Sequence, residues 1–304
     1  MLVKNLKYFL LLLIVSVILA LIIGIINGGL NLGIDFTGGS LITVDMGQTF
    51  DSEAVRDQIV KVDGIDNDAS VVTSGTEGKQ AIIKIKSVGD KATTTTVVNK
   101  MIESLKTQYP KVALGNIDSV GGVASGDMVK NAFSSVIIAS LLMLVYIWIR
   151  FDLSSGLGSV LALLHDVTVM TCAMCIFRVQ VDSTFIAACL TIVGYSINAT
   201  VVTYDRIREN MVKLNPNQYS KSDVVDISVR QTVMRNINTS LTTLIMVAAL
   251  YVFGVQSIKI FTLPLIVGIV SGTYSSILIA PPLWKVLSDR IGRNKKHKGK
   301  KAIR

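Results

Sequence analysis

The residues best able to carry chemistry lie inside apolar runs that are long enough to cross a membrane. His165 and Asp166 are adjacent in one run, Asn198 lies in the next, and Arg235 lies where a further run begins. Ionisable groups are costly in a bilayer and by default mark a path for ions or protons. Burial favours the neutral form of a carboxyl group, whereas a nearby guanidinium favours its charged form. We therefore expect Asp166, with Arg235 and Asn198, to bind and release an ion or proton.

Further polar residues join these candidates at helical spacing. They form two stripes, one in residues 189–210 and one after Arg235: Tyr195, Asn198, Asp205, Asn238, Thr239 and Thr242. The alternative is that the stripes only join neighbouring helices by hydrogen bonds. In that case Asp166 is a buried structural acid, and Arg235 is an interface residue whose long stem reaches water. Asp205 belongs to the charged cluster DRIREN, which is also typical of an anchor at a helix end.

The sequence gives no reason to expect a metal, a cofactor or a catalytic site. No second carboxylate or histidine shares helical spacing with His165 and Asp166, so a metal site is not expected. Cys172 and Cys175 form a CxxC inside an apolar helix, where packing is the expected role. Residues 31–125 contain no histidine and no grouping of acids typical of an active site. We therefore predict a binding or mechanical protein and not an enzyme.

The composition predicts a polytopic α-helical membrane protein. The chain has 304 residues, of which 50% are hydrophobic, and its mean hydropathy is +0.56. Six apolar runs predict six transmembrane helices, at about 8–26, 132–149, 153–177, 189–210, 237–253 and 263–287. Residues 222–234 predict an amphipathic helix on the membrane surface. The expected divisions are 1–30 (first helix), 31–125 (polar domain), 126–289 (helices two to six) and 290–304 (basic tail).

The distribution of basic residues predicts the orientation. The net charge of +9 comes from the N-terminus, from residues 206–213 and above all from the tail. With six spans all three regions lie on one side, which the positive-inside rule makes the cytoplasm. Both termini are then cytoplasmic and the polar domain lies outside. We expect the tail to attract anionic membrane lipid, and no motif supports binding of nucleic acid.

The pattern of residues 31–122 predicts a compact α+β domain. Strand-like alternation and amphipathic helices follow one another in the order β-α-β-β-α-β, which is the arrangement of a ferredoxin-like domain. Asp51 or Ser52 is the expected N-cap of its first helix. Glycine-rich joins at 27–30 and 121–126 predict that this domain moves as one body relative to the membrane.

Several blocks, taken in order, resemble the signature sequences of the SecF family. They are NLGIDFTGGS (31–40), SVGG (119–122), RF (150–151), LLHDV (163–167), GYSINATVVTYDRIREN (194–210) and RNINTSLTTL (235–244). The resemblance covers nearly the whole chain. It implies half of an RND-type helix bundle in the bacterial cytoplasmic membrane, completed by SecD. It also implies assistance to protein translocation at the SecYEG channel, driven by the proton-motive force, with SecA, YajC and the translocating polypeptide as further partners.

The chain departs from the family pattern at two positions. Many SecF sequences have an acid after the Asn of GYSIN, where this chain has Ala199, and many have proline where it has Gly122. A coupling carboxylate must then come from Asp166, from Asp205 or from SecD, and either protons or sodium ions can be the coupling ion. Two other functions stay open at this point, a subunit of an RND-type small-molecule efflux transporter and a structural scaffold.

Overall fold

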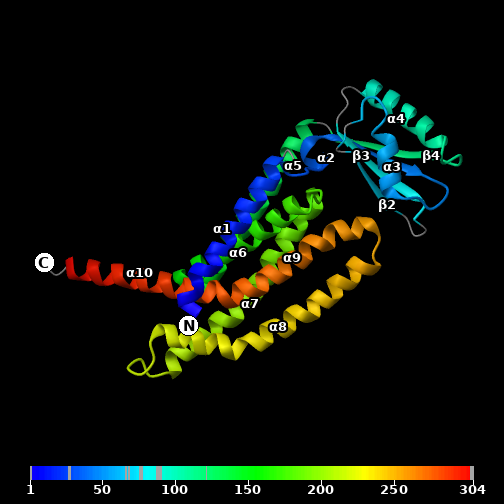
Figure 1. Ribbon diagram of the computed structural model, residues 1–304. Helices are drawn as coiled ribbons and strands as arrows, with labels where there is room; N and C mark the ends of the chain where they lie inside the picture. The colour runs from blue at the N-terminus through cyan, green and yellow to red at the C-terminus, as the bar shows by residue number, and fades with distance from the viewer. Residues whose placement is uncertain are drawn as a thin grey trace.

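The computed structural model describes residues 2–26, 29–65, 67, 69–74, 78–86, 91–120 and 122–301. A small sheet domain sits at one end of a bundle of long helices (Figure 1). The N-terminus and the last helix lie at the opposite end of the bundle. The elements are α1 (Leu2–Ile26), α2 (Ile34–Thr37), β1 (Gly39–Asp45), α3 (Ser52–Ile59), β2 (Ser70–Ser74), β3 (Gln80–Lys86), α4 (Lys91–Lys106), β4 (Ala113–Val120), α5 (Gly122–Arg150), α6 (Leu153–Ile176), α7 (Ser183–Lys213), α8 (Lys221–Phe253), α9 (Gln256–Leu278) and α10 (Ala280–Lys301).

The sheet domain has four antiparallel strands in the order β2-β3-β1-β4. Alternate residues of its strands and one face of each helix, α3 and α4, share a single core. Its fully buried members include Ile42, Val44, Val55, Ile59, Ile83, Val98, Met101 and Leu105. The predicted cap is confirmed, since the Asp51 side chain accepts a hydrogen bond of 3.1 Å from the Glu53 N–H at the start of α3.

Five of the described helices, α5 to α9, are long and apolar enough to cross a membrane. The first expected span lies within α1, whose described apolar section runs Val17–Ile26. Helix α9 packs against α6, α7 and α8, and 56% of its span is buried. Only 6% of the α5 span and 17% of the α8 span are buried. The bundle of this chain therefore leaves α5 and α8 largely uncovered.

Several expected boundaries differ from the ends of the observed helices. The surface helix at 222–234 and the fifth span are one continuous helix, α8, because no glycine or proline interrupts residues 221–253. The Ser220 side chain and Asp223 form a capping box that starts α8. The sixth span does not continue to residue 287. It ends at Leu278, and Pro281 and Pro282 fall in the first turn of α10, where their missing N–H groups cost no helical bond.

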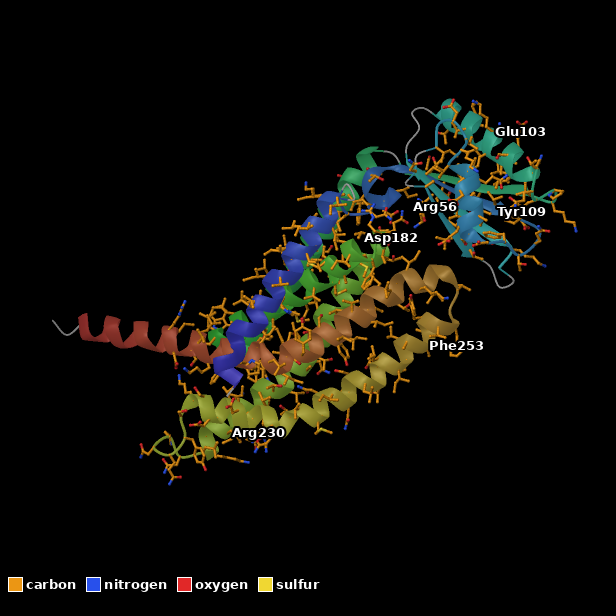
Figure 2. The ribbon with its side chains drawn as sticks, in the orientation of Figure 1. Arg56, Glu103, Tyr109, Asp182, Arg230 and Phe253 are labelled. Atoms are coloured by element: carbon orange, nitrogen blue, oxygen red, sulfur yellow. The ribbon has the colours of Figure 1, made fainter. Side chains whose placement is uncertain are left out.

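Other helices also begin earlier than the expected spans, among them α7 at Ser183 instead of 189 and α9 at Gln256 instead of 263. Helix α5 begins at Gly122 and not at residue 132. Residues 122–126 are therefore helical and do not form a loose join, while Gly121, Asn27 and Gly28 lie outside the described residues. Helix α8 spans the bundle from Arg230 near one end to Phe253 at the other (Figure 2). Of the expected tail, residues up to Lys301 continue α10, and residues 302–304 lie outside the described part.

Backbone and charged contacts dock the sheet domain on the near end of the bundle. Val181 N donates to Asn31 O and Gly33 N donates to Val181 O, each at 2.8 Å. The Lys84 ammonium on β3 lies 3.3 Å from Oδ2 of Asp182, the residue that caps α7. Figure 2 shows Asp182 directly beneath the sheet domain. Any movement of this domain as one body would have to break these contacts.

Candidate functional site

Asp166 lies on α6 at the centre of a buried polar network. Its side chain is fully buried. Oδ2 accepts hydrogen bonds from the Ser196 hydroxyl of α7 at 2.6 Å and from the Ser275 hydroxyl of α9 at 2.9 Å. Both hydroxyls are buried as well. A buried carboxyl group is tolerated only with such partners, and here they come from two other helices.

The network continues from Asp166 through the neighbouring histidine. The His165 Nδ1 atom lies 3.1 Å from Asp166 Oδ1, and its Nε2 atom lies 3.0 Å from the Tyr274 hydroxyl. The His165 and Tyr274 rings meet edge to face at 5.2 Å between centroids. Carboxyl, imidazole and phenol can all bind or release a proton. Protonation or deprotonation of Asp166 would therefore alter contacts on α6, α7 and α9 together.

Two glycines allow the helices around Asp166 to approach closely. A Cβ atom at Gly268 would lie 2.4 Å from the Ile192 side chain, and one at Gly272 would lie 3.1 Å from the Ser196 side chain. The GxxxG sequence at these positions is thus a packing contact of α9 against α7. The same contact brings Ser196 and Ser275 to one carboxylate oxygen.

A second, separate group of polar residues lines a pocket between α7 and α8. The pocket has a volume of about 130 Å³. Arg235 is exposed on its rim and, among the described residues, has no ion-pair partner. The Tyr195 hydroxyl is buried with no hydrogen-bond partner. The lining residues are Tyr195, Asn198, Ala199, Val202, Arg235, Asn236, Thr239 and Ser240.

Hydrogen bonds beside this pocket hold α7 and α8 together. The Asn236 amide donates to the Thr203 hydroxyl at 3.1 Å and to the Ala199 carbonyl at 3.4 Å. Ala199, where many SecF sequences carry an acid, is itself in the lining. The pocket therefore contains a guanidinium and amide groups but, among the residues that the structure describes, no carboxylate.

The structure divides the predicted site residues between these two places. Asp166 contacts Ser196 and not Asn198, because residues two apart in a helix point about 200° apart. Asn198, Arg235 and the exposed residues of the α8 stripe, Asn238, Thr239 and Thr242, lie on the α7–α8 face. Asp205 is exposed about two turns further along α7 than Asn198. In this conformation no hydrogen bond or ion pair joins Asp166 to Arg235 among the described residues.

Ser196, Tyr274 and Ser275 were not among the residues expected to form the site. A signal for Ser275 was present, since Gly268, Gly272 and Ser275 recur at i, i+4 and i+7 along one helix face. Small residues on one face indicate close helix packing, so a hydroxyl in that stripe is expected to reach a partner on the neighbouring helix. The described residues include no group of three or more side chains able to hold a metal ion.

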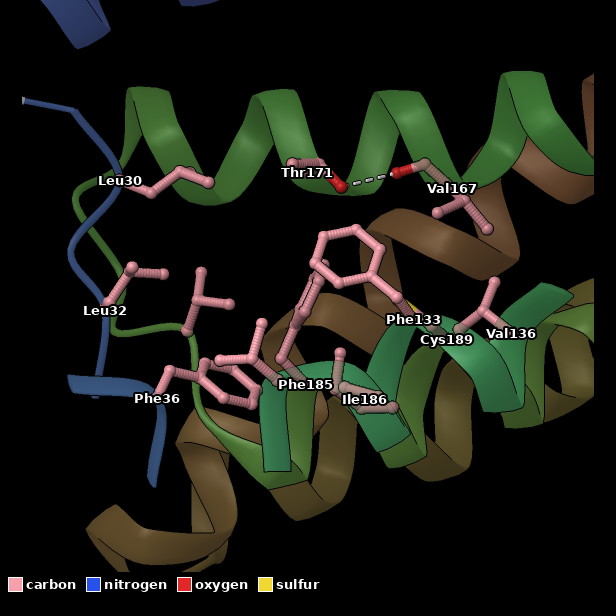
Figure 3. Close-up of a pocket in the computed structure, with 13 residues that line it drawn as sticks. Leu30, Leu32, Phe36, Phe133, Val136, Val167, Thr171, Phe185, Ile186 and Cys189 are labelled. Carbon is pink, nitrogen blue, oxygen red and sulfur yellow. Dashed lines mark hydrogen bonds between the residues drawn. The ribbon is translucent and has the colours of Figure 1, made fainter. Parts of the chain in front are cut away.

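A larger cavity at the end of the bundle next to the sheet domain offers no comparable chemistry. It has a volume of about 330 Å³ and lies between residues 30–36 and helices α5, α6 and α7 (Figure 3). Phe36, Phe133 and Phe185 dominate its walls. The hydroxyl of Thr171 donates to the Val167 carbonyl at 2.9 Å. The lining is thus apolar and presents no free polar group that could orient an ion.

The family models that match this chain cover most of its length. Residues 100–290 match "Protein export membrane protein SecD/SecF, C-terminal", and residues 23–49 match "SecD/SecF GG Motif". The chain is 39% identical to protein translocase subunit SecF of Sebaldella termitidis, over 89% of this chain and 86% of that protein. It is 38% identical to protein translocase subunit SecDF of Bacillus subtilis, over 84% of this chain and 34% of that protein.

A solved structure shows the same arrangement of elements. The crystal structure of SecDF from Thermus thermophilus, a translocon-associated membrane protein, superposes with a TM-score of 0.76 at 29% identity. The match covers 94% of this chain and 38% of the SecDF chain. The chain thus spans about a third of the length of the SecDF proteins that it resembles.

Proposed function

This chain belongs to the SecD/SecF protein-export family, and we propose that it forms one half of an ion-driven export complex whose other half is SecD. Its relatives are protein translocase subunits, which supports an accessory role in protein export and does not favour small-molecule efflux. SecF-like and SecD-like parts are joined in single SecDF chains, which supports SecD as the partner.

The observation that carries this proposal is the uncovered polar face of α7 and α8. Asn198, Arg235 and Thr242 are exposed there on helices that are apolar enough to cross a membrane. Lipid cannot supply hydrogen bonds to such groups, so a second protein must cover them. The pocket on this face is lined by a guanidinium and, among the described residues, by no acid, and the exposed acid of the same α7 stripe, Asp205, lies about two turns away. We therefore propose that SecD covers the face and places a carboxylate beside Arg235.

The ion path that we propose joins the hydrogen-bond network around Asp166 to the pocket that Arg235 lines. Protonation of Asp166 would weaken the hydrogen bonds that it accepts from the Ser196 and Ser275 hydroxyls, because a neutral carboxyl group is a weaker acceptor than a carboxylate. Helix α7 would transmit that change to Tyr195 and Asn198. Arg235 would respond by pairing with, or separating from, the acid of SecD. The coupling ion is a proton or sodium.

Further parts of the proposal concern the organisation of the chain. We assign six transmembrane helices, α1 and α5 to α9, with both termini in the cytoplasm of a bacterial cell.

The β-α-β-β-α-β order and the sheet order β2-β3-β1-β4 support a ferredoxin-like class for the outer domain. This domain would act on the translocating polypeptide outside the membrane. SecYEG, with SecA and YajC, completes the set of proposed partners.

Cysteine crosslinking tests whether SecD covers the polar face. Asn198→Cys or Thr242→Cys, combined with cysteines on the SecD helices, should form crosslinks between the two chains in intact membranes. Ile137→Cys on α5 is the matched control, because Ile137 is 57% exposed on the helix with the least buried span. Native cysteines 172, 175 and 189 are buried. Crosslinks from Ile137→Cys but none from the α7–α8 positions would refute the proposed contact.

A further inference from the structure

A cavity of about 380 Å³ lies at the end of the bundle remote from the sheet domain. The turn between α5 and α6, the last turns of α7 and the first turns of α10 surround it. Its lining combines aromatic, aliphatic and charged side chains: Phe151, Asp152, Ser155, Tyr204, Ile207, Arg208, Met211, Val212, Trp284 and Ser288. Neither the Asp166 network nor the Arg235 pocket uses these residues.

Two guanidinium groups, one in the lining of this cavity and one beside it, have no carboxylate partner among the described residues. Arg208 lines the cavity, and its Nη1 donates to the Arg150 carbonyl at 3.4 Å. The Arg150 guanidinium carbon lies 5.4 Å from the centroid of the Phe151 ring, which lines the cavity. The acid in the lining, Asp152, is engaged as the cap of α6, where it accepts the Ser155 N–H at 2.8 Å and the Ser155 hydroxyl.

The neighbouring lysines, by contrast, are partly neutralised, because both pair with one carboxylate. Lys285 Nζ and Lys221 Nζ lie 3.0 Å and 3.4 Å from the Asp289 carboxylate. Partial burial alone would raise the pKa of Asp289, but these two ammonium groups hold it below its usual range. The unpaired guanidinium groups nearest a ligand are therefore that of Arg208, in the lining, and that of Arg150, beside the lining residue Phe151, while the two lysines add a residual positive charge nearby.

The apolar wall shows what kind of anion fits. Val212 is 85% exposed and Met211 is 37% exposed on the last turns of α7. Trp284 and Tyr204 form the inner wall, and aromatic residues of this kind are frequent at the level of lipid headgroups. A small soluble anion would gain nothing from this apolar surface, whereas an acyl chain would remove it from water.

We infer that the cavity binds one anionic phospholipid. Arg150 and Arg208 hold the phosphate group, and the first carbons of an acyl chain lie against Met211, Val212 and Trp284. Guanidinium groups bind phosphate oxygens through paired hydrogen bonds, and basic pockets between membrane helices bind anionic headgroups in the same way.

Native mass spectrometry of the purified complex with its SecD partner tests the site. The probe is phosphatidylglycerol, titrated against phosphatidylcholine of the same chain length. Arg150→Gln and Arg208→Gln should each weaken phosphatidylglycerol binding about fivefold, since one basic residue near an anionic headgroup contributes a factor of that size. The double variant should weaken it about 25-fold. Arg230→Gln is the matched control, because Arg230 is exposed on α8 and is not in the cavity lining.

Two further measurements test whether the cavity binds the acyl chain as well as the headgroup. Val212→Glu places a carboxylate on an exposed position of the cavity wall, so the fold should survive while bound phosphatidylglycerol is lost. Glycerol phosphate lacks acyl chains and should not displace the lipid. Equal binding of phosphatidylcholine, an unchanged affinity in the double arginine variant, or displacement by glycerol phosphate would each overturn the inference.

Discussion

Replacement of Arg235 by glutamine should abolish the gradient-dependent part of protein export while the complex with SecD stays assembled. Arg235 has no acid partner among the described residues of this chain, and the pocket position that carries an acid in many SecF sequences is Ala199. If a SecD carboxylate completes the pocket, glutamine leaves that acid unpaired. Truncation of one partner in a desolvated charge pair costs about 2–5 kcal/mol. The population of the coupled state should therefore fall at least about 30-fold.

The measurement is export of a preprotein into inverted membrane vesicles with ATP, with and without a proton or sodium gradient. Arg235→Lys should also impair stimulation, because an ammonium group cannot reproduce the planar, two-pronged contact of a guanidinium. Arg230→Gln, on the same helix but outside the pocket, should leave stimulation unchanged. Full gradient stimulation in the Arg235→Gln vesicles would exclude this residue from the coupling step.

Replacement of Asp166 by asparagine should also remove gradient stimulation, for a different reason. Asparagine keeps the shape of the side chain and one acceptor oxygen, so Ser196 and Ser275 retain a hydrogen-bond partner and the helices stay packed. The amide cannot take up a proton, however, and the exchange that we propose at this position stops. The expected result is an assembled complex, with ATP-driven export at the wild-type basal rate and no response to the gradient.

Two companion variants separate this role from simple packing. Asp166→Ala removes the acceptor of the buried Ser196 hydroxyl, whereas the Ser275 hydroxyl can still donate to the Gly272 carbonyl at 3.3 Å. An unsatisfied buried group costs about 1–3 kcal/mol, so the yield of assembled complex should drop. Thr171→Val, also on α6, removes a hydroxyl that bonds only within its own helix and should have no effect. If Asp166→Asn vesicles respond to the gradient like wild type, Asp166 is a packing residue and coupling rests with Arg235 and SecD.

The sequence was sufficient to predict elements whose signals are local. Asp51 and the 3.6-residue pattern after it predicted the start and the buried face of α3. The apolar run from Leu153 predicted α6 to within one residue of its observed end. The charged and polar run 221–235 was misread, because polarity indicated a surface segment while the absence of any helix breaker allowed α8 to continue through it.

The candidate site was only partly predictable, because its partners come from different helices. Periodicity placed Tyr195 and Asn198 on one stripe of α7, and it equally placed Ser196 on the other side. It gave no information on which side would face Asp166. That choice depends on the close approach of α9 at Gly268 and Gly272, which brings Ser196 and Ser275 to the same oxygen. Pairing between helices is a tertiary property that one sequence does not specify.

Dependence on SecD is the most direct test of the proposed half-complex. The chain should be purified in mild detergent, alone and together with SecD, and each preparation reconstituted with the export channel and assayed for gradient-stimulated export. Buried polar groups without partners are expensive, so the chain alone should aggregate and give no stimulation, while the pair should be monodisperse and active. A monodisperse single chain that stimulates export in response to the gradient without SecD would contradict the account.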